Sequence, residues 1–156
     1  MQKSIAMVSI SVMALALLVL AVGVAWAQRY VPQPTPDSLI LMPWPRQMTL
    51  EEGKYRLTTD FSVSVTGNPA PRLDGGATWF LRQLQEMTGL FLKQARVTAK
   101  DASRVSSLRI RVNRPGNVRL GEDESYALQV TPREITLRAE TDLGALHGLQ
   151  TLLQLV

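Results

Sequence analysis

The chain has 156 residues, 46% hydrophobic and 19% charged, with 17 Lys and Arg against 13 Asp and Glu, a formal net charge of +4. This composition is typical of one globular domain with an attached segment and excludes a disordered chain. The basic residues are scattered, which indicates a solvated basic surface and no nucleic-acid partner. Because cysteine is absent, disulfides, thiolate metal sites and cysteine nucleophiles are excluded.

Residues 1–27 have the pattern of a signal peptide. Lys3 supplies a positive start, residues 12–25 are an unbroken apolar run, and Ala25-Trp26-Ala27 has the small-x-small form that a signal peptidase reads. The apolar stretch also extends over residues 5–27, which is long enough for an uncleaved N-terminal anchor. Both alternatives place the rest of the chain outside the cytoplasm, in the periplasm or the extracellular space.

Residues 28–38 predict a Pro-rich linker. Pro32, Pro34 and Pro36 stand at alternate positions. Each proline fixes its own φ and pushes the preceding residue to extended angles. The segment is therefore a stiff spacer that leads to a single domain over residues 39–156.

The first part of this domain has the period of two that strands show. Met48 and Leu50 alternate with polar residues up to a break at Glu51-Glu52-Gly53. Tyr55 and Leu57 alternate after the break, so this stretch predicts a hairpin. A further strand is expected through the alternating apolar residues Phe61, Val63 and Val65.

A helical period follows the turn at Gly67-Asn68-Pro69. Asp74 is expected to cap the helix at its start, and Gly89 to end it. Its apolar face consists of Ala77, Phe80, Leu81, Leu84 and Met87. Beyond it, we expect a short strand at residues 95–98 and a clear one through Leu108, Ile110 and Val112.

The last part of the chain predicts a hairpin and then a helix. Its two antiparallel strands are joined by a turn at Pro132-Arg133-Glu134. Thr141 or Asp142 is expected to cap the helix that follows. The apolar residues of the hairpin, Leu128 included, are expected to face one side and to be buried: Tyr126, Leu128, Val130, Ile135, Leu137 and Ala139.

Two glycines interrupt the final helix. A glycine inside a helix costs about 1 kcal/mol relative to alanine, so Gly144 and Gly148 indicate that another backbone comes close. We expect the helix to lie between its own sheet and a second surface, either another helix of the domain or a further domain. Its leucine and glycine surface is expected to remain partly uncovered and to self-associate, which Leu153→Lys or Leu155→Lys reduces.

Two stretches of the chain resemble a known family. ESYALQVTPREITLRAETDLGALHGLQTLLQL is similar to the end, and LMPWPRQMTLEEGKYRL to the opening, of the N-terminal domain of β-N-acetylhexosaminidases of glycoside hydrolase family 20. The resemblance implies an α+β fold for residues 39–156, an antiparallel sheet with two helices packed on one face. In that family a catalytic (β/α)₈ barrel with a His-x-Gly-Gly-Asp-Glu motif follows.

The resemblance therefore implies a non-catalytic domain of an exported enzyme, truncated before the barrel that is its expected partner. The complete enzyme removes terminal N-acetylhexosamine from glycans or chitin fragments. Two alternatives stay open. One is a free-standing exported module that binds a carbohydrate or a protein, and the other is the N-terminal domain of an α-glucuronidase or an O-linked N-acetylglucosamine hydrolase.

No catalytic, cofactor-binding or metal-ligating residue is expected in this chain, and no cofactor. Residues 121–124, Gly-Glu-Asp-Glu, lack the preceding His-x-Gly-Gly and indicate a solvated acidic loop. His147, the only histidine, is expected on the polar side of the last helix. Trp44 is expected to pack against a turn, and Trp79 to flank the core face of its helix.

If the signal is cleaved after Ala27, the mature chain begins at Gln28. Mass spectrometry of the exported protein then shows this N-terminus, with or without cyclisation to pyroglutamate. Recovery of residues 1–27 on the chain in a membrane fraction identifies the segment as an anchor.

Overall fold

The computed structural model describes residues 39–98 and 106–156. The predicted signal peptide and the whole of the predicted linker, residues 28–38, lie outside these residues. The described part contains, in chain order, β1 (Val63–Gly67), α2 (Arg72–Thr88), β2 (Leu108–Arg114), β3 (Tyr126–Val130), β4 (Ile135–Thr141) and α3 (Asp142–Gln154). None of its helices is long and apolar enough to cross a membrane.

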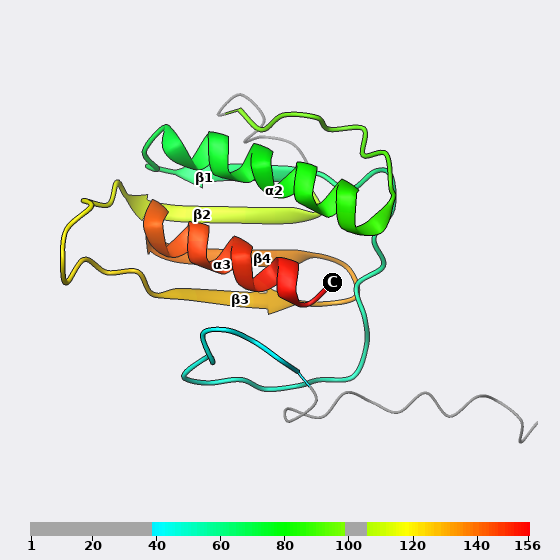
Figure 1. Ribbon diagram of the computed structural model, residues 1–156, viewed down its shortest axis with the longest axis horizontal. Helices are drawn as coiled ribbons and strands as arrows, with labels where there is room; N and C mark the ends of the chain where they lie inside the picture. The colour runs from blue at the N-terminus through cyan, green and yellow to red at the C-terminus, as the bar shows by residue number, and fades with distance from the viewer. Residues whose placement is uncertain (1–38, 99–105) are drawn as a thin grey trace, which may run out of the picture. The chain divides into compact units, whose positions relative to one another are not determined.

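The four strands form one sheet in the order β1-β2-β4-β3 (Figure 1). The strands β1, β2 and β4 run parallel, and β3 is antiparallel to β4. The sheet is therefore mixed, and the expectation of a purely antiparallel sheet is wrong. The reason lies in the connections, because α2 returns the chain over one face between β1 and β2 and so makes these strands parallel.

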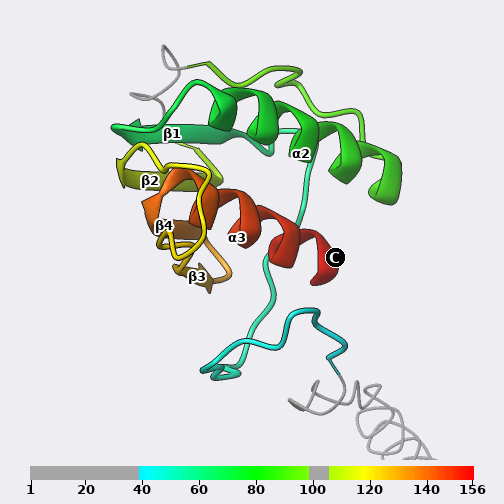
Figure 2. The same cartoon turned by 60° about the vertical axis from the view of Figure 1, so that its left-hand side comes forward.

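Both helices pack on the same face of the sheet, which confirms the α+β class. Figures 1 and 2 show α2 over β1 and β2, and α3 over β4 and β3. The largest fully buried side chains come from both layers and include Phe61, Phe80, Leu73, Leu81, Leu84, Leu108, Ile110 and Leu137. The alternation of β2 thus predicts its buried residues correctly, and so does the helical period of α2 except at Met87, which is 55% exposed.

The ends of the two helices agree with the capping residues predicted from the sequence, except at the start of α2. Gly89 ends α2 in a left-handed conformation with φ of 68°, as predicted. The residue before α2 is Pro71, which makes no side-chain cap, and Asp74 lies within the first turn, so the expected capping role of Asp74 is wrong. Thr141 caps α3, and its hydroxyl accepts a hydrogen bond from the Gly144 N–H at 3.2 Å.

Two predicted strand regions form no strand. Residues 48–57 and 95–98 are irregular, although Tyr55 and Leu57 pack against the core. Alternation records which side chains point toward the core, whereas a strand also needs a neighbouring backbone with which to pair. The alternating pattern therefore predicted that Tyr55 and Leu57 contact the core, but it did not predict whether their backbone pairs with another strand.

The hairpin is present, but its two strands differ in burial. The register places Leu128 opposite Leu137 and Val130 opposite Ile135, so these residues share one face as predicted. Leu137 is completely buried, whereas Leu128 is partly buried and Val130 is 42% exposed. Because β3 is the edge strand, the expected burial of its residues is wrong.

The final helix is covered more fully than expected. Leu149, Leu152 and Leu153 are buried, and Leu155 and Val156 after the helix are exposed. The second surface that it contacts is α2, where a Cβ added at Gly76 would lie 2.2 Å from a methyl carbon of Leu146. An uncovered leucine and glycine surface on this helix is thus not observed, and Leu153→Lys would place a charge in the core.

The burial difference between the paired leucines gives a test of the fold. Leu137→Ala is expected to lower the free energy of unfolding by about 2–5 kcal/mol, because Leu137 is enclosed by the sheet and α3. Leu128→Ala is expected to cost clearly less, since water already reaches this side chain. Denaturant titration of both variants measures the two losses, and equal losses would contradict the edge position of β3.

Candidate functional site

The most organised polar region is the connection between β2 and β3, which lies beside the start of α3. Asp142, whose side chain is 0% exposed, is central to it. One carboxylate oxygen accepts a hydrogen bond from the Gly116 N–H at 2.6 Å, and the other forms an ion pair with the Arg72 guanidinium. Arg72 also donates to the Gly116 carbonyl, so Asp142 joins α2, this connection and α3.

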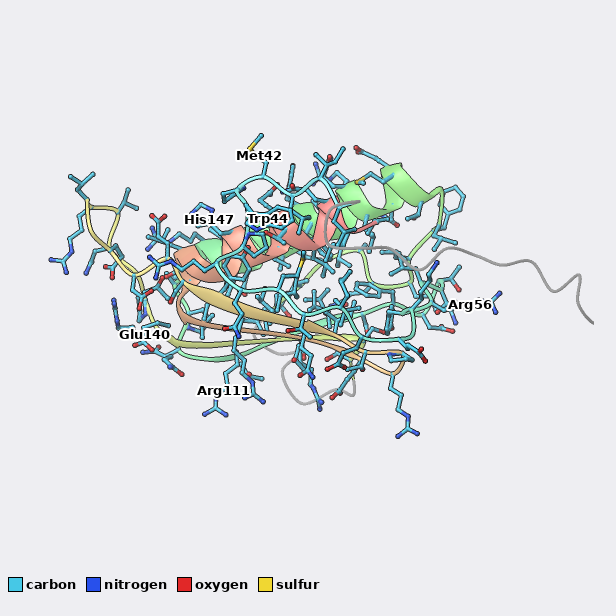
Figure 3. All side chains as sticks on the ribbon, turned by 90° about the horizontal axis from the view of Figure 1, so that it is seen from below. Met42, Trp44, Arg56, Arg111, Glu140 and His147 are labelled. Atoms are coloured by element: carbon cyan, nitrogen blue, oxygen red, sulfur yellow. The ribbon has the colours of Figure 1, made fainter. Side chains whose placement is uncertain are left out.

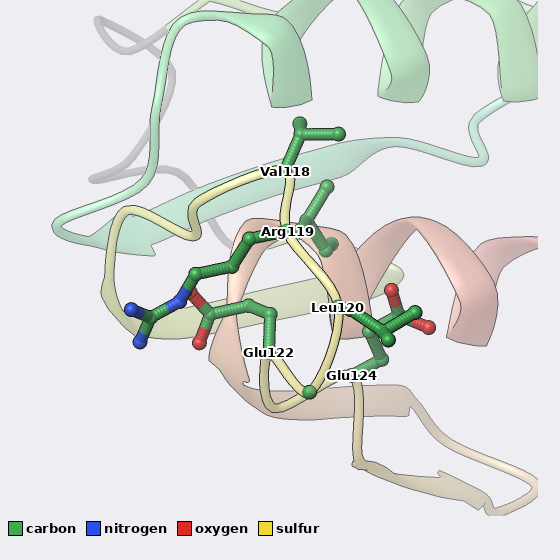
Figure 4. A pocket seen from close by; sticks show the side chains of 7 residues that line it. Val118, Arg119, Leu120, Glu122 and Glu124 are labelled. Carbon is green, nitrogen blue, oxygen red and sulfur yellow. The ribbon is translucent and has the colours of Figure 1, made fainter.

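Glu122 organises the tip of the same connection, and its side chain is only 2% exposed. Its carboxylate accepts hydrogen bonds from the Arg114 guanidinium at 2.7 Å and from the backbone N–H groups of Asn117 and Asp123 at 2.9 and 3.0 Å. Arg119 lies 3.9 Å away (Figure 4). These donors, Arg114 first, lower the pKa of Glu122 from 4.5 to about 2.

The other two acids of the loop are exposed. Asp123 accepts hydrogen bonds from the hydroxyl and the N–H of Ser125 at 2.6 and 2.9 Å, and these lower its pKa. Glu124 lies 3.2 Å from the imidazole of His147, both side chains being about half exposed. The sequence therefore predicted correctly that Asp123 and Glu124 are solvated, whereas Glu122 is enclosed by its own loop.

This loop borders a pocket at the start of α3, and Figure 4 shows side chains that line it. Val118 and Leu120 stand exposed at its rim, and Leu143 lines it from α3. A general acid for glycoside hydrolysis needs a raised pKa in a site that excludes water. Glu122 and Asp123 have lowered pKa values, so they serve as hydrogen-bond acceptors that hold the loop.

The two tryptophans of the described residues, Trp44 and Trp79, lie apart from this loop in the chain. Trp44 belongs to the irregular segment before β1 and is 56% exposed, and Trp79, on α2, is 41% exposed. Both rings are thus more accessible than the sequence indicated. Within residues 39–98 and 106–156, no group of three or more His, Asp or Glu side chains could hold a metal ion.

Sequence reasoning missed the two ion-pair centres. Asp142 was predicted to act at the helix start, but its partner Arg72 lies 70 residues away. Glu122 was assigned to a solvated loop, and its ion pair with Arg114 depends on the loop folding back onto the end of β2. Arg114 and Glu122 are eight residues apart across a loop, and this spacing has no helical or strand period. In the sequence, only the turn-forming residues around Glu122 indicated a compact loop.

Comparison with known proteins shows the family. Residues 41–155 match the family described as beta-acetyl hexosaminidase like, and the chain belongs to it. A solved chitobiase from Flavobacterium johnsoniae is 45% identical, with a TM-score of 0.76, over 79% of this chain and 19% of that chain. No curated protein matches the chain.

Two more distant structures support the same fold. An N-acetyl-beta-hexosaminidase from Streptomyces plicatus, in complex with Thio-NAglucal, is 26% identical, with a TM-score of 0.55, over 81% of this chain and 23% of that one. An exo beta-N-acetylglucosaminidase from Vibrio harveyi shares the fold. It is 21% identical, with a TM-score of 0.53, over 74% of this chain and 16% of that chain. The chain therefore spans about a fifth of the length of these solved relatives.

The lowered pKa of Glu122 predicts a pH-dependent contribution to stability. A depressed pKa stabilises the folded state above the unfolded value of 4.5, and this contribution is lost as the pH falls toward about 2. Glu122→Gln is therefore expected to lower the melting temperature at pH 6, and its difference from the unchanged chain to shrink at pH values around 2.

Glu52→Gln is the matched control, because it removes the same charge from an exposed side chain without an ion pair. Thermal unfolding followed by circular dichroism at both pH values measures the differences. A Glu122→Gln effect that stays the same at both pH values would show that the carboxylate is not held by its donors.

Proposed function

We propose that this chain is a non-catalytic domain of an exported β-N-acetylhexosaminidase that removes terminal N-acetylhexosamine from glycans or chitin fragments. The observation that carries the proposal is the 45% identity to a chitobiase, of which the chain spans 19%. Its partner is the catalytic barrel of the same enzyme. Glycan substrates then belong to the complete enzyme, and export relies on the signal pattern of residues 1–27.

The chemistry of the described loop supports a non-catalytic role. Hydrolysis of a hexosaminide needs a proton donor for the leaving oxygen and a group that stabilises the oxocarbenium-like transition state. The two loop carboxylates with shifted pKa values are stabilised in their charged form by neighbouring donors. At neutral pH they therefore have no proton to give.

The segment before β1 supports a neighbouring domain on the helix side. The Met42 N–H donates to the Gln154 side-chain oxygen at 2.7 Å, and the Gln154 amide donates to the Met42 carbonyl at 3.0 Å. This two-bond clamp holds the segment at the end of α3, with the Met42 and Trp44 side chains exposed (Figure 3). Exposed apolar side chains on an ordered segment are the groups that an adjoining domain covers.

A chimaera tests the proposal directly. Residues 41–155 replace the matching segment of the Flavobacterium chitobiase, and the product is assayed with a chromogenic N-acetylglucosaminide. The chimaera is expected to hydrolyse it, because the two domains share the fold and 45% sequence identity, whereas the chain alone gives no turnover above a heat-treated control. Asp142→Ala in the chimaera is the control, because it keeps the domain in place but removes the ion pair with Arg72 and the hydrogen bond from Gly116.

Two results would contradict the proposal. The first is a chimaera that folds, as judged by circular dichroism, and has no activity, which would show that this domain cannot serve such an enzyme. The second is turnover by the chain alone that survives repurification and disappears in Asp123→Asn or Glu124→Gln, which would place an active site in the loop between β2 and β3.

A further inference from the structure

The face of the sheet opposite the helices carries two arginines on neighbouring strands. In Figure 3 the Arg111 side chain points away from the helix layer. Register places Thr66 beside Arg111, Arg111 beside Arg138, and Arg138 beside Ala127, so these four residues form one row across all four strands. Thr66 donates its hydroxyl to the Ile110 carbonyl at 3.2 Å, and Ala127 is too short to reach a guanidinium.

The carboxylates nearest to this row are engaged with other groups. Glu134 forms an ion pair with Arg109. Glu140 accepts a hydrogen bond from the Asn113 amide at 2.7 Å and lies 3.5 Å from the Arg114 guanidinium. Within the part of the chain that the structure describes, Arg111 and Arg138 are therefore exposed and have no ionic partner.

Two unpaired guanidinium groups in this position repel each other. Arg111 and Arg138 are direct register partners on adjacent strands, and backbones of neighbouring strands lie about 4.8 Å apart. Like charges directly opposite each other in a sheet are destabilising. An anion between them removes the repulsion, and each guanidinium presents a planar fork of donors that fits the oxygens of a sulfate or phosphate.

We propose that Arg111 and Arg138 form a binding site for a tetrahedral oxyanion, sulfate or phosphate, either free or carried as a substituent on a larger molecule. The two forks bind the same anion from neighbouring strands, and the short Ala127 leaves the site open toward the β3 edge of the sheet. The site is on the opposite face from the helices and does not depend on the function proposed above.

Thermal unfolding in sulfate tests the site. The full chain is kept in a non-ionic detergent because residues 1–27 are apolar, and sulfate is compared with chloride at equal ionic strength. At about ten times the dissociation constant, bound sulfate is expected to raise the melting temperature by roughly 5 °C. Arg111→Gln and Arg138→Gln are expected to lose this extra rise.

Arg82→Gln is the matched control, because it removes the same charge from an exposed arginine on α2. Sulfate also stabilises proteins without binding, through its exclusion from the surface, and this general effect is common to all variants. If the rise in sulfate is equal in Arg111→Gln, Arg138→Gln and Arg82→Gln, no site exists and the proposal is overturned.

A second arm distinguishes the source of the anion. Inorganic sulfate is compared with dextran sulfate at equal sulfate concentration, again with both variants. Saturation at a lower concentration with the polymer, lost in both variants, supports a substituent on a larger molecule, and equal saturation supports the free ion. Arg111→Lys keeps the charge without the fork, so it is expected to retain only part of the rise.

Discussion

The buried carboxylate of Asp142 is the interaction on which the arrangement of the domain depends. It lies at the first position of α3, and it bonds to Arg72 at the first position of α2 and to the backbone of Gly116 beyond β2. An ionised side chain with no exposed surface is tolerated only when paired and hydrogen-bonded. The starts of both helices are thus held together at the end of the sheet where β1, β2 and β4 finish.

The helix α3 also packs closely on the sheet. Gly144 faces the backbone of Glu124 and Ser125, and a Cβ there would lie 2.4 Å from the Ser125 carbonyl oxygen. At Gly148 a Cβ would lie 2.3 Å from a methyl carbon of Leu137. The helical glycines therefore serve the approach of the helix to its own hairpin, which is the physical reason for residues that otherwise weaken a helix.

The two faces of the resulting domain differ in chemistry. On the helix side, the segment held by Gln154 exposes Met42 and Trp44, apolar groups suited to a neighbouring domain. On the opposite sheet face, Arg111 and Arg138 stand opposite each other, and no carboxylate among the described residues pairs with them. Between them, the ion pair of Asp142 joins the starts of the two helices, and that of Glu122 joins the loop to the end of β2.

The sequence by itself determined the features that depend on neighbouring residues. Alternation predicted β2 and the hairpin of β3 and β4, the helical period predicted α2 and α3, and Gly89 and Thr141 marked a helix end and a helix start. Strand direction was decided only by the tertiary structure, because it depends on how the connections cross the sheet. The same holds for residues 48–57, which alternate without a pairing partner, and for Arg72 and Asp142, since a contact across 70 residues leaves no trace in local periodicity.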